Sequence, residues 1–439
     1  MATLEAQVAH TWRRLGFGPT IDDIDAGVAS GTQSIIDDLT TRPATTEADW
    51  GFPTEDSWQE MTRFGEVAIN NMALTSNPLQ ERLAWILTGL TVVSLTGPVK
   101  YPDMYDYEKL CRNRALGSYK QLLSDLVTHP GMLWYLSGIH STKWHPNENF
   151  ARELMELFSL GSRHVVTGES PYTEGDIAEI SRCLTGYRWD WDDHFSYFHE
   201  PWWDDGDKTF LGSTHVAGDV EDVLDTVCSQ DAWSYFVPHR LWLEFVGTEP
   251  SQAVLDSLAP VWGPDGDLLA VVAAIAQHPE FTSDAAIRSR VKSPVELIAS
   301  GMRMLGHDEC DDFYTTWRLF QLGYHPLYCP SVSGWPAGSK LLHSTYLMIW
   351  SELARKMCWL DDGDDDVAEA DRCVPIRRLY AESTAASAVD FCRRLAGLES
   401  LTPKTQSALQ SYADAGTWNF RRAAGLMNLL LVSPEFIAN

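Results

Sequence analysis

The segment from Asn147 to Gly161, NENFARELMELFSLG, combines acidic and basic side chains with apolar residues at helical spacing. On a helix, Arg152 lies one turn from both Glu148 and Glu156, and Glu153 follows Arg152 directly. Two roles are open for these four residues. In a catalytic site, Glu153 and Glu156 act as bases or metal ligands while Arg152 orients an anion. In a structural network, the same ion pairs hold the helix in place.

Histidine is missing from the spacings that helical metal sites use. The chain contains no Glu-x-x-His and no His-x-x-x-His, the patterns of helical di-iron and zinc peptidase sites. The candidate metal ligands are therefore Glu153, Glu156, His194 and His199, and a divalent metal stays open as a cofactor. No phosphate-binding glycine loop, dinucleotide fingerprint or nucleophile elbow occurs, so we expect no nucleotide cofactor.

Polar and aromatic residues follow the acidic segment. In YTEGDIAEISRCLTGYRW (172–189), Thr173 is a predicted N-cap with Asp176 three residues later, and the polar face is either ion-paired or part of a site. The overlapping segment 187–203, YRWDWDDHFSYFHEPWW, holds eight aromatic residues. These rings either pack as a second hydrophobic cluster or line a pocket for a flat, apolar or sugar-like ligand.

A loop rich in proline and glycine, PSVSGWPAG, carries a further tryptophan that either fills the core or forms the wall of a cavity. The candidate substrate-binding residues are Asp176, Arg182, Trp189, Lys208 and Trp335. The aspartate runs at 190–193 and 361–366 add a minor alternative, a lyase like the terpene cyclases, in which acidic residues lie above an aromatic cavity.

Helices must position these residues. Apolar residues recur at intervals of three and four along most of the chain, as in 219–229 and 339–357. We predict an all-α fold of roughly fifteen helices: a large multi-helix single body with long aromatic-rich loops and at most a small β-hairpin. The best strand candidate is RHVVTG, Arg163–Gly168. One domain then spans 1–439, with an N-terminal subregion at 1–140 and a C-terminal helical layer at 210–439.

Charge and composition narrow the partners. Lys and Arg number 33 against 61 Asp and Glu, a formal charge of −28, which disfavours nucleic acid and anionic lipid. No stretch reaches the roughly 18 to 20 apolar residues that span a bilayer, and no signal peptide is recognisable. The eight cysteines form no CxxC pair, which indicates buried thiols rather than a zinc ribbon. We expect a small-molecule substrate and a cytoplasmic location.

Six motifs together make the chain similar to a known family. They are HTWRRLGFGPT, NENFARELMELFSLG, YTEGDIAEISRCLTGYRW, DKTFLG, KSPVEL and PSVSGWPAG, and they run from His10 to about Gly338, with SPEF near the C-terminus. In this order they resemble the bacterial family catalogued as domain of unknown function 1800. The resemblance implies a large helical protein, often exported and encoded beside a sulfatase-like partner family. It implies a protein partner encoded nearby and no settled activity.

The chain departs from that family at two places. Members often carry a Trp-His-x-His-Phe-like segment, but the matching stretch here is WILTGLTVVS (85–94), with Thr88 and Leu90 where histidines would stand. The His-Asp pair that often precedes the Lys-Thr-Leu-Gly motif is Trp203-Asp204 here. If those histidines bind metal in relatives, this chain has lost that set. With no export signal recognised, the departures favour a cytosolic, specialised member, for example in a biosynthetic pathway.

Three hypotheses follow from these observations. The leading one is an enzyme of bacterial specialised metabolism that acts on a small, partly apolar or aromatic substrate by carboxylate acid–base chemistry, in a pocket between the acidic helix and the aromatic loop. The second is a non-catalytic scaffold or partner protein in which Arg152 pairs with buried carboxylates, so that its loss costs on the order of 3–5 kcal/mol. The third is a metal-dependent oxidoreductase.

Overall fold

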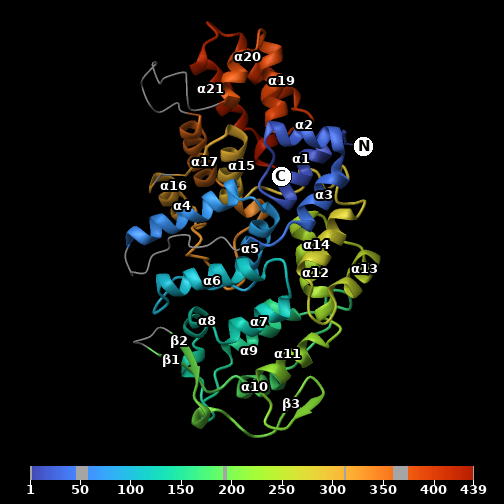
Figure 1. The fold of residues 1–439 in the computed structure, drawn as a ribbon, viewed down its shortest axis with the longest axis vertical. Coiled ribbons are helices and arrows are strands. Elements are labelled where there is room, and N and C mark those ends of the chain that lie inside the picture. The colour runs from blue at the N-terminus through green and yellow to red at the C-terminus, as the bar shows by residue number, and fades with distance from the viewer. Residues whose placement is uncertain (1, 46–57, 191–194, 311–312, 359–373, 439) are drawn as a thin grey trace.

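The computed structural model describes residues 2–45, 58–190, 195–310, 313–358 and 374–438. The described residues form a mainly helical body, as predicted, with 22 α-helices instead of about fifteen. Figure 1 shows an elongated molecule, with α19, α20 and α21 (Ala385–Leu395, Pro403–Asp414 and Phe420–Leu431) at one end and α10 (Glu174–Cys183) at the other.

The first half of the chain contributes helices α1 to α11. Their bounds are α1 Leu4–Leu15, α2 Ile21–Ser30, α3 Thr32–Thr41, α4 Trp58–Leu74, α5 Pro78–Leu90, α6 Tyr101–Arg114, α7 Tyr119–Val127, α8 Pro130–Tyr135, α9 Asn149–Glu153 and α11 Val220–Cys228. Short 3₁₀ turns lie at Gly138–His140 and Glu200–Trp202, and a π-helical segment, η2, spans Leu154–Ser159.

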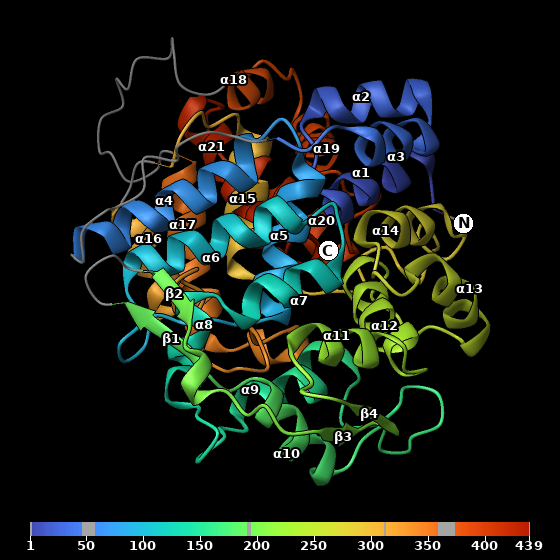
Figure 2. The same ribbon diagram turned by 60° about the horizontal axis from the view of Figure 1, so that its bottom comes forward.

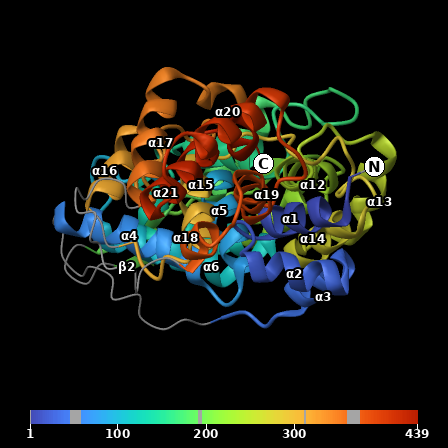
Figure 3. The same cartoon turned by 90° about the horizontal axis from the view of Figure 1, so that it is seen from above.

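The helices of the second half complete the body. Their bounds are α12 Trp233–Phe245, α13 Gln252–Trp262, α14 Leu268–Gln277, α15 Pro294–Leu305, α16 Phe313–Gln321, α17 Ser344–Met357, α18 Val374–Tyr380 and α22 Pro434–Ile437, with a 3₁₀ turn at Gly338–Leu341. Figure 3 shows α3 beside α14, and the two helices are in contact. The N-terminal helices thereby cover part of the α12–α14 layer.

The described strands form two small antiparallel hairpins, where at most one was expected. β1 (Tyr187–Asp190) pairs with β2 (Phe195–Phe198), and β3 (Lys208–Phe210) pairs with β4 (Ser213–His215). Figure 2 shows β3 and β4 beside α10 at one end of the molecule.

The predicted strand at 163–168 is wrong. His164 Nδ1 accepts hydrogen bonds from the backbone N–H groups of Val166 and Thr167, and Gly168 N donates to the His164 carbonyl. These local bonds close a turn, because a side-chain acceptor that satisfies nearby N–H groups replaces a strand partner.

Two hydrophobic clusters form the core. The first is built mainly from α1, α5–α12 and α14, and the second mainly from α15, α17–α19 and α21. Helix α5 contributes to both, because Leu83 and Leu87 belong to the first cluster and Trp85 to the second. The space beside α5 therefore lies where the two clusters meet.

Local sequence signals explain the starts of the two helices that border this space. Asn77 caps α5 by accepting from Gln80 N, and Pro78 follows at the first helical position. Ser293 and Glu296 form a reciprocal capping box at the start of α15, with Pro294 between them.

Two further observations concern membrane-spanning helices and cysteines. Within the described ranges, no helix is long and apolar enough to cross a bilayer. The seven cysteines in those ranges are buried and free, as predicted for them, and Cys373 lies outside the described residues.

Candidate functional site

The acidic segment changes helical type partway along its length. Helix α9 ends at Glu153 and the backbone continues as the π-helix η2, where Leu160 N donates to Met155 O. Arg152 pairs with Glu148 (3.1 Å) and with Glu174 of α10 (2.8 Å). The predicted second partner was Glu156. A π-helical turn contains more residues than an α-helical one, so the position four residues after Arg152 is no longer one full turn away.

This ion-pair network is open to solvent. The side chains of Glu148, Arg152 and Glu174 are 46%, 36% and 77% exposed, which corrects the assumption that Arg152 pairs with buried carboxylates. Glu153 differs from them, because burial and the neighbouring Glu156 raise its pKa while Arg152 opposes the shift. Glu153 is thus the half-buried carboxylate of the predicted catalytic set whose proton affinity is raised.

Three predicted substrate-binding residues connect α10 to the β3–β4 hairpin. Asp176 caps α10 and accepts from Leu211 N at 2.7 Å. Arg182 donates to Asp204 Oδ2 at 2.8 Å, and the fully buried Lys208 donates to the Asp204 carbonyl oxygen. The fourth, Trp189, is buried in a small cluster of its own beside α8. The Arg152–Glu174 pair joins α10, with Asp176 and Arg182, to the acidic segment, whereas Trp189 lies apart from them.

The candidate metal ligands are not brought together in one described site. His199 packs edge-on against Trp202, and His194 lies outside the described residues. Among the residues that the structure describes, no three His, Cys, Asp or Glu side chains are grouped to hold a metal ion.

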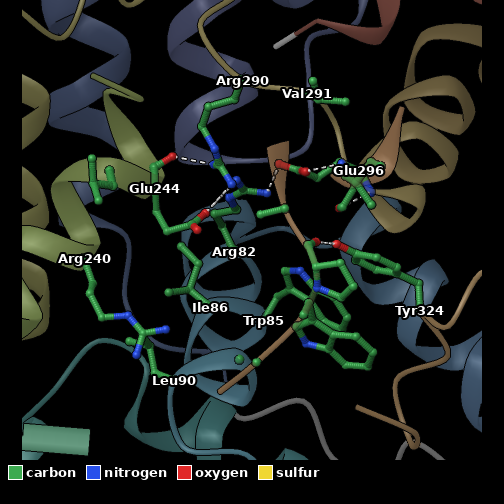
Figure 4. Close-up of a pocket in the computed structure, with 18 of the residues that line it drawn as sticks. Arg82, Trp85, Ile86, Leu90, Arg240, Glu244, Arg290, Val291, Glu296 and Tyr324 are labelled. Atoms are coloured by element: carbon green, nitrogen blue, oxygen red, sulfur yellow. Dashed lines mark hydrogen bonds and ion pairs between the residues drawn. The ribbon is translucent and has the colours of Figure 1, made fainter. Parts of the chain in front are cut away.

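The fifth predicted substrate-binding residue, Trp335, lines a cavity elsewhere in the molecule. The cavity has a volume of about 170 Å³ and lies beside α5. Its walls come from α5, from the end of α12, from the segment that leads into α15, from Tyr324 and from the loop 333–337 (Figure 4). The cavity therefore lies where the two hydrophobic clusters meet, a common position for small-molecule sites.

Stacked rings form one wall of the cavity. The Trp335 ring is stacked with Trp85, at a centroid distance of 5.0 Å and an interplanar angle of 21°, and with Tyr324, at 5.3 Å and 24°. The Tyr324 hydroxyl donates to the Pro336 carbonyl. Gly334 lets the loop pass directly over α5, because a Cβ there would lie only 2.5 Å from the Gly89 carbonyl oxygen.

Two ion pairs form another wall, one buried and one partly exposed. Arg82 Nη1 lies 2.5 Å from Glu296 Oε1, and Arg290 Nη2 lies 2.6 Å from Glu244 Oε2 (Figure 4). Burial alone would raise the pKa of Glu296, but Arg82 and Arg290 hold that pKa well below its usual range. Arg82 is therefore paired with a carboxylate that is stable as an anion.

Arg240 is the third arginine of the cavity and differs from the other two. It donates to the carbonyl oxygen of Leu157 at 3.3 Å, and its guanidinium lies 5.9 Å from the centroid of the Phe236 ring. Within the described part of the chain, it makes no ion pair. Burial lowers its pKa, with Tyr119 and Glu244 opposing the shift. Three arginines and two glutamates line the cavity, so its formal charge is +1.

Arg240 also links the cavity to the acidic segment, because Leu157 belongs to η2. Glu148, Arg152, Glu153 and Glu156 are not among the residues that line the cavity. The acidic segment thus contacts a cavity residue through its backbone.

None of the charged residues that line the cavity was among the predicted site residues: Arg82, Arg240, Glu244, Arg290 and Glu296. Two features of the sequence are connected with this cavity. KSPVEL and PSVSGWPAG, both noted for the family resemblance, supply Glu296 and Trp335. The Ser-x-x-Glu spacing in KSPVEL is a further signal, not used in the sequence analysis, that would have identified Glu296 as a capping carboxylate.

Comparison with other proteins bears directly on the family resemblance. Searches against curated proteins and against solved structures give no match. A family model described as Protein of unknown function (DUF1800) matches residues 10–438, nearly the whole length. The chain therefore belongs to the DUF1800 family.

Proposed function

We propose that the protein is an enzyme whose substrate is a small organic anion with a flat, apolar body, bound in the cavity beside α5. The single observation that carries this proposal is the state of Arg240. Two of the three cavity arginines are paired with glutamates, whereas Arg240 makes no ion pair within the described residues. A half-buried guanidinium without a counterion favours an anionic ligand, since burying an uncompensated charge is costly.

The other walls suit the rest of such a substrate. Trp85, Ile86 and Leu90 supply apolar surface, and Figure 4 shows Arg240 and Tyr324 on opposite sides of the pocket. Glu244 is the carboxylate that a bound molecule reaches most easily, because its side chain is 33% exposed against 6% for Glu296. We assign the acid–base role of the proposed enzyme to Glu244.

Binding measurements on the full chain test this proposal. Small carboxylates and phosphates are compared with their neutral amides or alcohols by calorimetry, on wild type and on Arg240→Gln. We expect the anions to bind, the neutral analogues to fail, and Arg240→Gln to lose at least about tenfold in affinity, the usual cost of a charge-assisted hydrogen bond. The control is Arg42→Gln, which removes a partly exposed arginine that follows α3 and pairs with Asp38 of that helix.

The catalytic part has its own test. Glu244→Gln should keep anion binding, since it frees Arg290, but should stop conversion of a bound anion followed by NMR. Equal binding of neutral analogues, or full affinity in Arg240→Gln, would contradict the proposal. Conversion at the wild-type rate in Glu244→Gln would contradict the role of Glu244.

A second candidate function keeps the acid–base site at Glu153 and Glu156, with Arg152 and Glu148 beside them. The raised pKa of Glu153 supports it, because a carboxyl group with increased proton affinity is a better base at neutral pH. Glu153→Gln and Glu156→Gln leave the cavity walls intact. If both variants fold and convert the substrate as fast as wild type, this candidate is abandoned.

A cytoplasmic location is part of the proposal. The seven buried, free cysteines support it, since thiols stay reduced in the cytosol.

A further inference from the structure

We infer that the cavity selects a monocarboxylate with a single planar ring, of the size of benzoate. The inference rests on the proposed function and narrows its substrate class. It joins three properties of the cavity: the number of uncompensated charges, the volume, and the chemistry of the walls.

The charge balance selects a ligand with one negative charge. Among the residues that line the cavity, Glu296 pairs with Arg82, and Glu244 pairs with Arg290 and more distantly, at 4.0 Å, with Arg82. The two glutamates balance two of the three arginines, which leaves the single charge of Arg240 for a ligand. A phosphate monoester carries almost two negative charges at neutral pH. Its second charge would have to displace Glu244 or Glu296 from a paired arginine. A carboxylate matches the one available charge.

The geometry of a guanidinium fits a carboxylate as well. Arg240 commits one N–H to the Leu157 carbonyl oxygen. A guanidinium has five N–H donors in a plane, so the remaining donors can hold both carboxylate oxygens in parallel. The bond to Leu157 fixes the orientation of Arg240 before the ligand arrives.

The volume selects a single ring. The cavity measures about 170 Å³, close to the roughly 150 Å³ of an engineered protein cavity that accepts benzene. A nucleotide, with a base, a sugar and phosphate, is too large to be enclosed in this space. The same comparison separates one-ring acids from fused-ring acids.

The walls favour a flat ring over a puckered one. Trp335 is stacked with Trp85 and with Tyr324, so a ligand in the cavity meets this group of flat rings together with Ile86 and Leu90. Aromatic pairs gain from edge-to-face or offset contacts beyond the area they bury. A saturated ring of similar size gains only the burial.

Four probes of nearly equal size test the inference on the full chain: benzoate, cyclohexanecarboxylate, benzamide and phenyl phosphate. We expect benzoate to bind tightest by calorimetry. Phenyl phosphate and benzamide should each be weaker by at least about tenfold, the effect of an unmatched charge or a lost charge-assisted bond. Cyclohexanecarboxylate should be weaker by a few-fold.

Variants locate the selectivity. Arg240→Gln should remove the preference for benzoate over benzamide. Arg240→Lys keeps the positive charge but lacks the planar set of N–H donors, so it should retain part of this preference. Trp85→Leu should abolish the preference of benzoate over cyclohexanecarboxylate while keeping the discrimination against benzamide. Arg42→Gln should bind all four probes as wild type does.

The outcomes separate this inference from the proposed function. If phenyl phosphate binds more tightly than benzoate and its binding depends on Arg240, the monocarboxylate inference is overturned. If cyclohexanecarboxylate does so, the planar-ring inference is overturned. In both cases the anion site of the proposed function stands. Binding of benzamide as tight as that of benzoate, or Arg240→Gln with unchanged affinity for every anion, overturns both.

Discussion

Arg82 Nη1 and Glu296 Oε1 lie 2.5 Å apart, with side chains that are 1% and 6% exposed. The other carboxylate oxygen of Glu296 accepts the N–H of Ser293 at 2.7 Å. One side chain therefore caps α15 and neutralises an arginine of α5. Because α15 belongs to the second hydrophobic cluster and α5 contributes Leu83 and Leu87 to the first, the pair links the two clusters beside the cavity.

Glu296→Gln should destabilise the protein strongly. The substitution leaves Arg82 buried without its nearest carboxylate, and breaking a buried ion pair costs about 3–5 kcal/mol. Urea unfolding followed by circular dichroism measures this change in the free energy of unfolding. The matched control is Glu169→Gln, which changes an exposed glutamate and should alter stability by less than about 0.5 kcal/mol. Equal stability of both variants would show that Arg82 does not depend on Glu296.

Helical periodicity predicted most of the fold, because an apolar stripe must face the core. Capping signals predicted local starts well: Thr173 and Asp176 form the expected capping box at α10. The turn at His164 was missed because Val and Thr favour strands in isolation, whereas the His164 ring supplies local acceptors that propensity does not register.

The cavity was harder to predict than the helices. Arg82, Arg240 and Arg290 come from separate parts of the chain, and spacing within one helix cannot show which carboxylates meet them. Trp335 was recognised from its loop, as a residue that fills the core or walls a cavity, but its neighbours Trp85 and Tyr324 depend on tertiary packing. The Arg152 network shows the same limit, since its partner Glu174 lies on another helix.

Arg152→Ala should have little effect on stability. Its ion pair with Glu148 is solvent-exposed, and such pairs contribute less than about 1 kcal/mol. The buried counterpart, Arg82→Ala, leaves Glu296 without its nearest cation and should cost several times more. Thermal unfolding of the two variants under the same conditions gives the comparison. A large loss of stability in Arg152→Ala would support the original scaffold hypothesis, in which Arg152 pairs with buried carboxylates.

Gly334→Ala should disturb the aromatic wall of the cavity. Gly334 has φ +97°, which is unfavourable for alanine, and a Cβ there would lie 2.5 Å from the Gly89 carbonyl oxygen. We expect a loss of more than about 1 kcal/mol in unfolding free energy, together with a change in tryptophan fluorescence as Trp335 moves off Trp85.

Gly338→Ala is the control for that substitution. Gly338 also has a positive φ, +61°, but no atom lies within 4 Å of its ideal Cβ. It therefore reports the cost of the backbone conformation alone. If both variants lose equal stability and both keep the wild-type fluorescence, the close approach of Gly334 to Gly89 does not hold the wall in place.

Glu108 should make stability depend on pH. Its Oε1 atom is buried without a hydrogen-bond partner among the described residues, and burial together with Glu81 raises its pKa to about 8. In the unfolded chain a glutamate ionises near pH 4.3. Between about pH 4.3 and 8 the folded state therefore holds a proton that the unfolded state has lost, so the free energy of unfolding falls as pH rises. Above pH 8 this contribution becomes constant. Glu108→Gln cannot ionise at this position and should lack this pH-dependent contribution. Its stability relative to that of wild type should therefore be higher at pH 9 than at pH 5. Urea unfolding of both proteins at one-unit pH intervals gives the two curves, and parallel curves would show that Glu108 ionises normally in the folded protein.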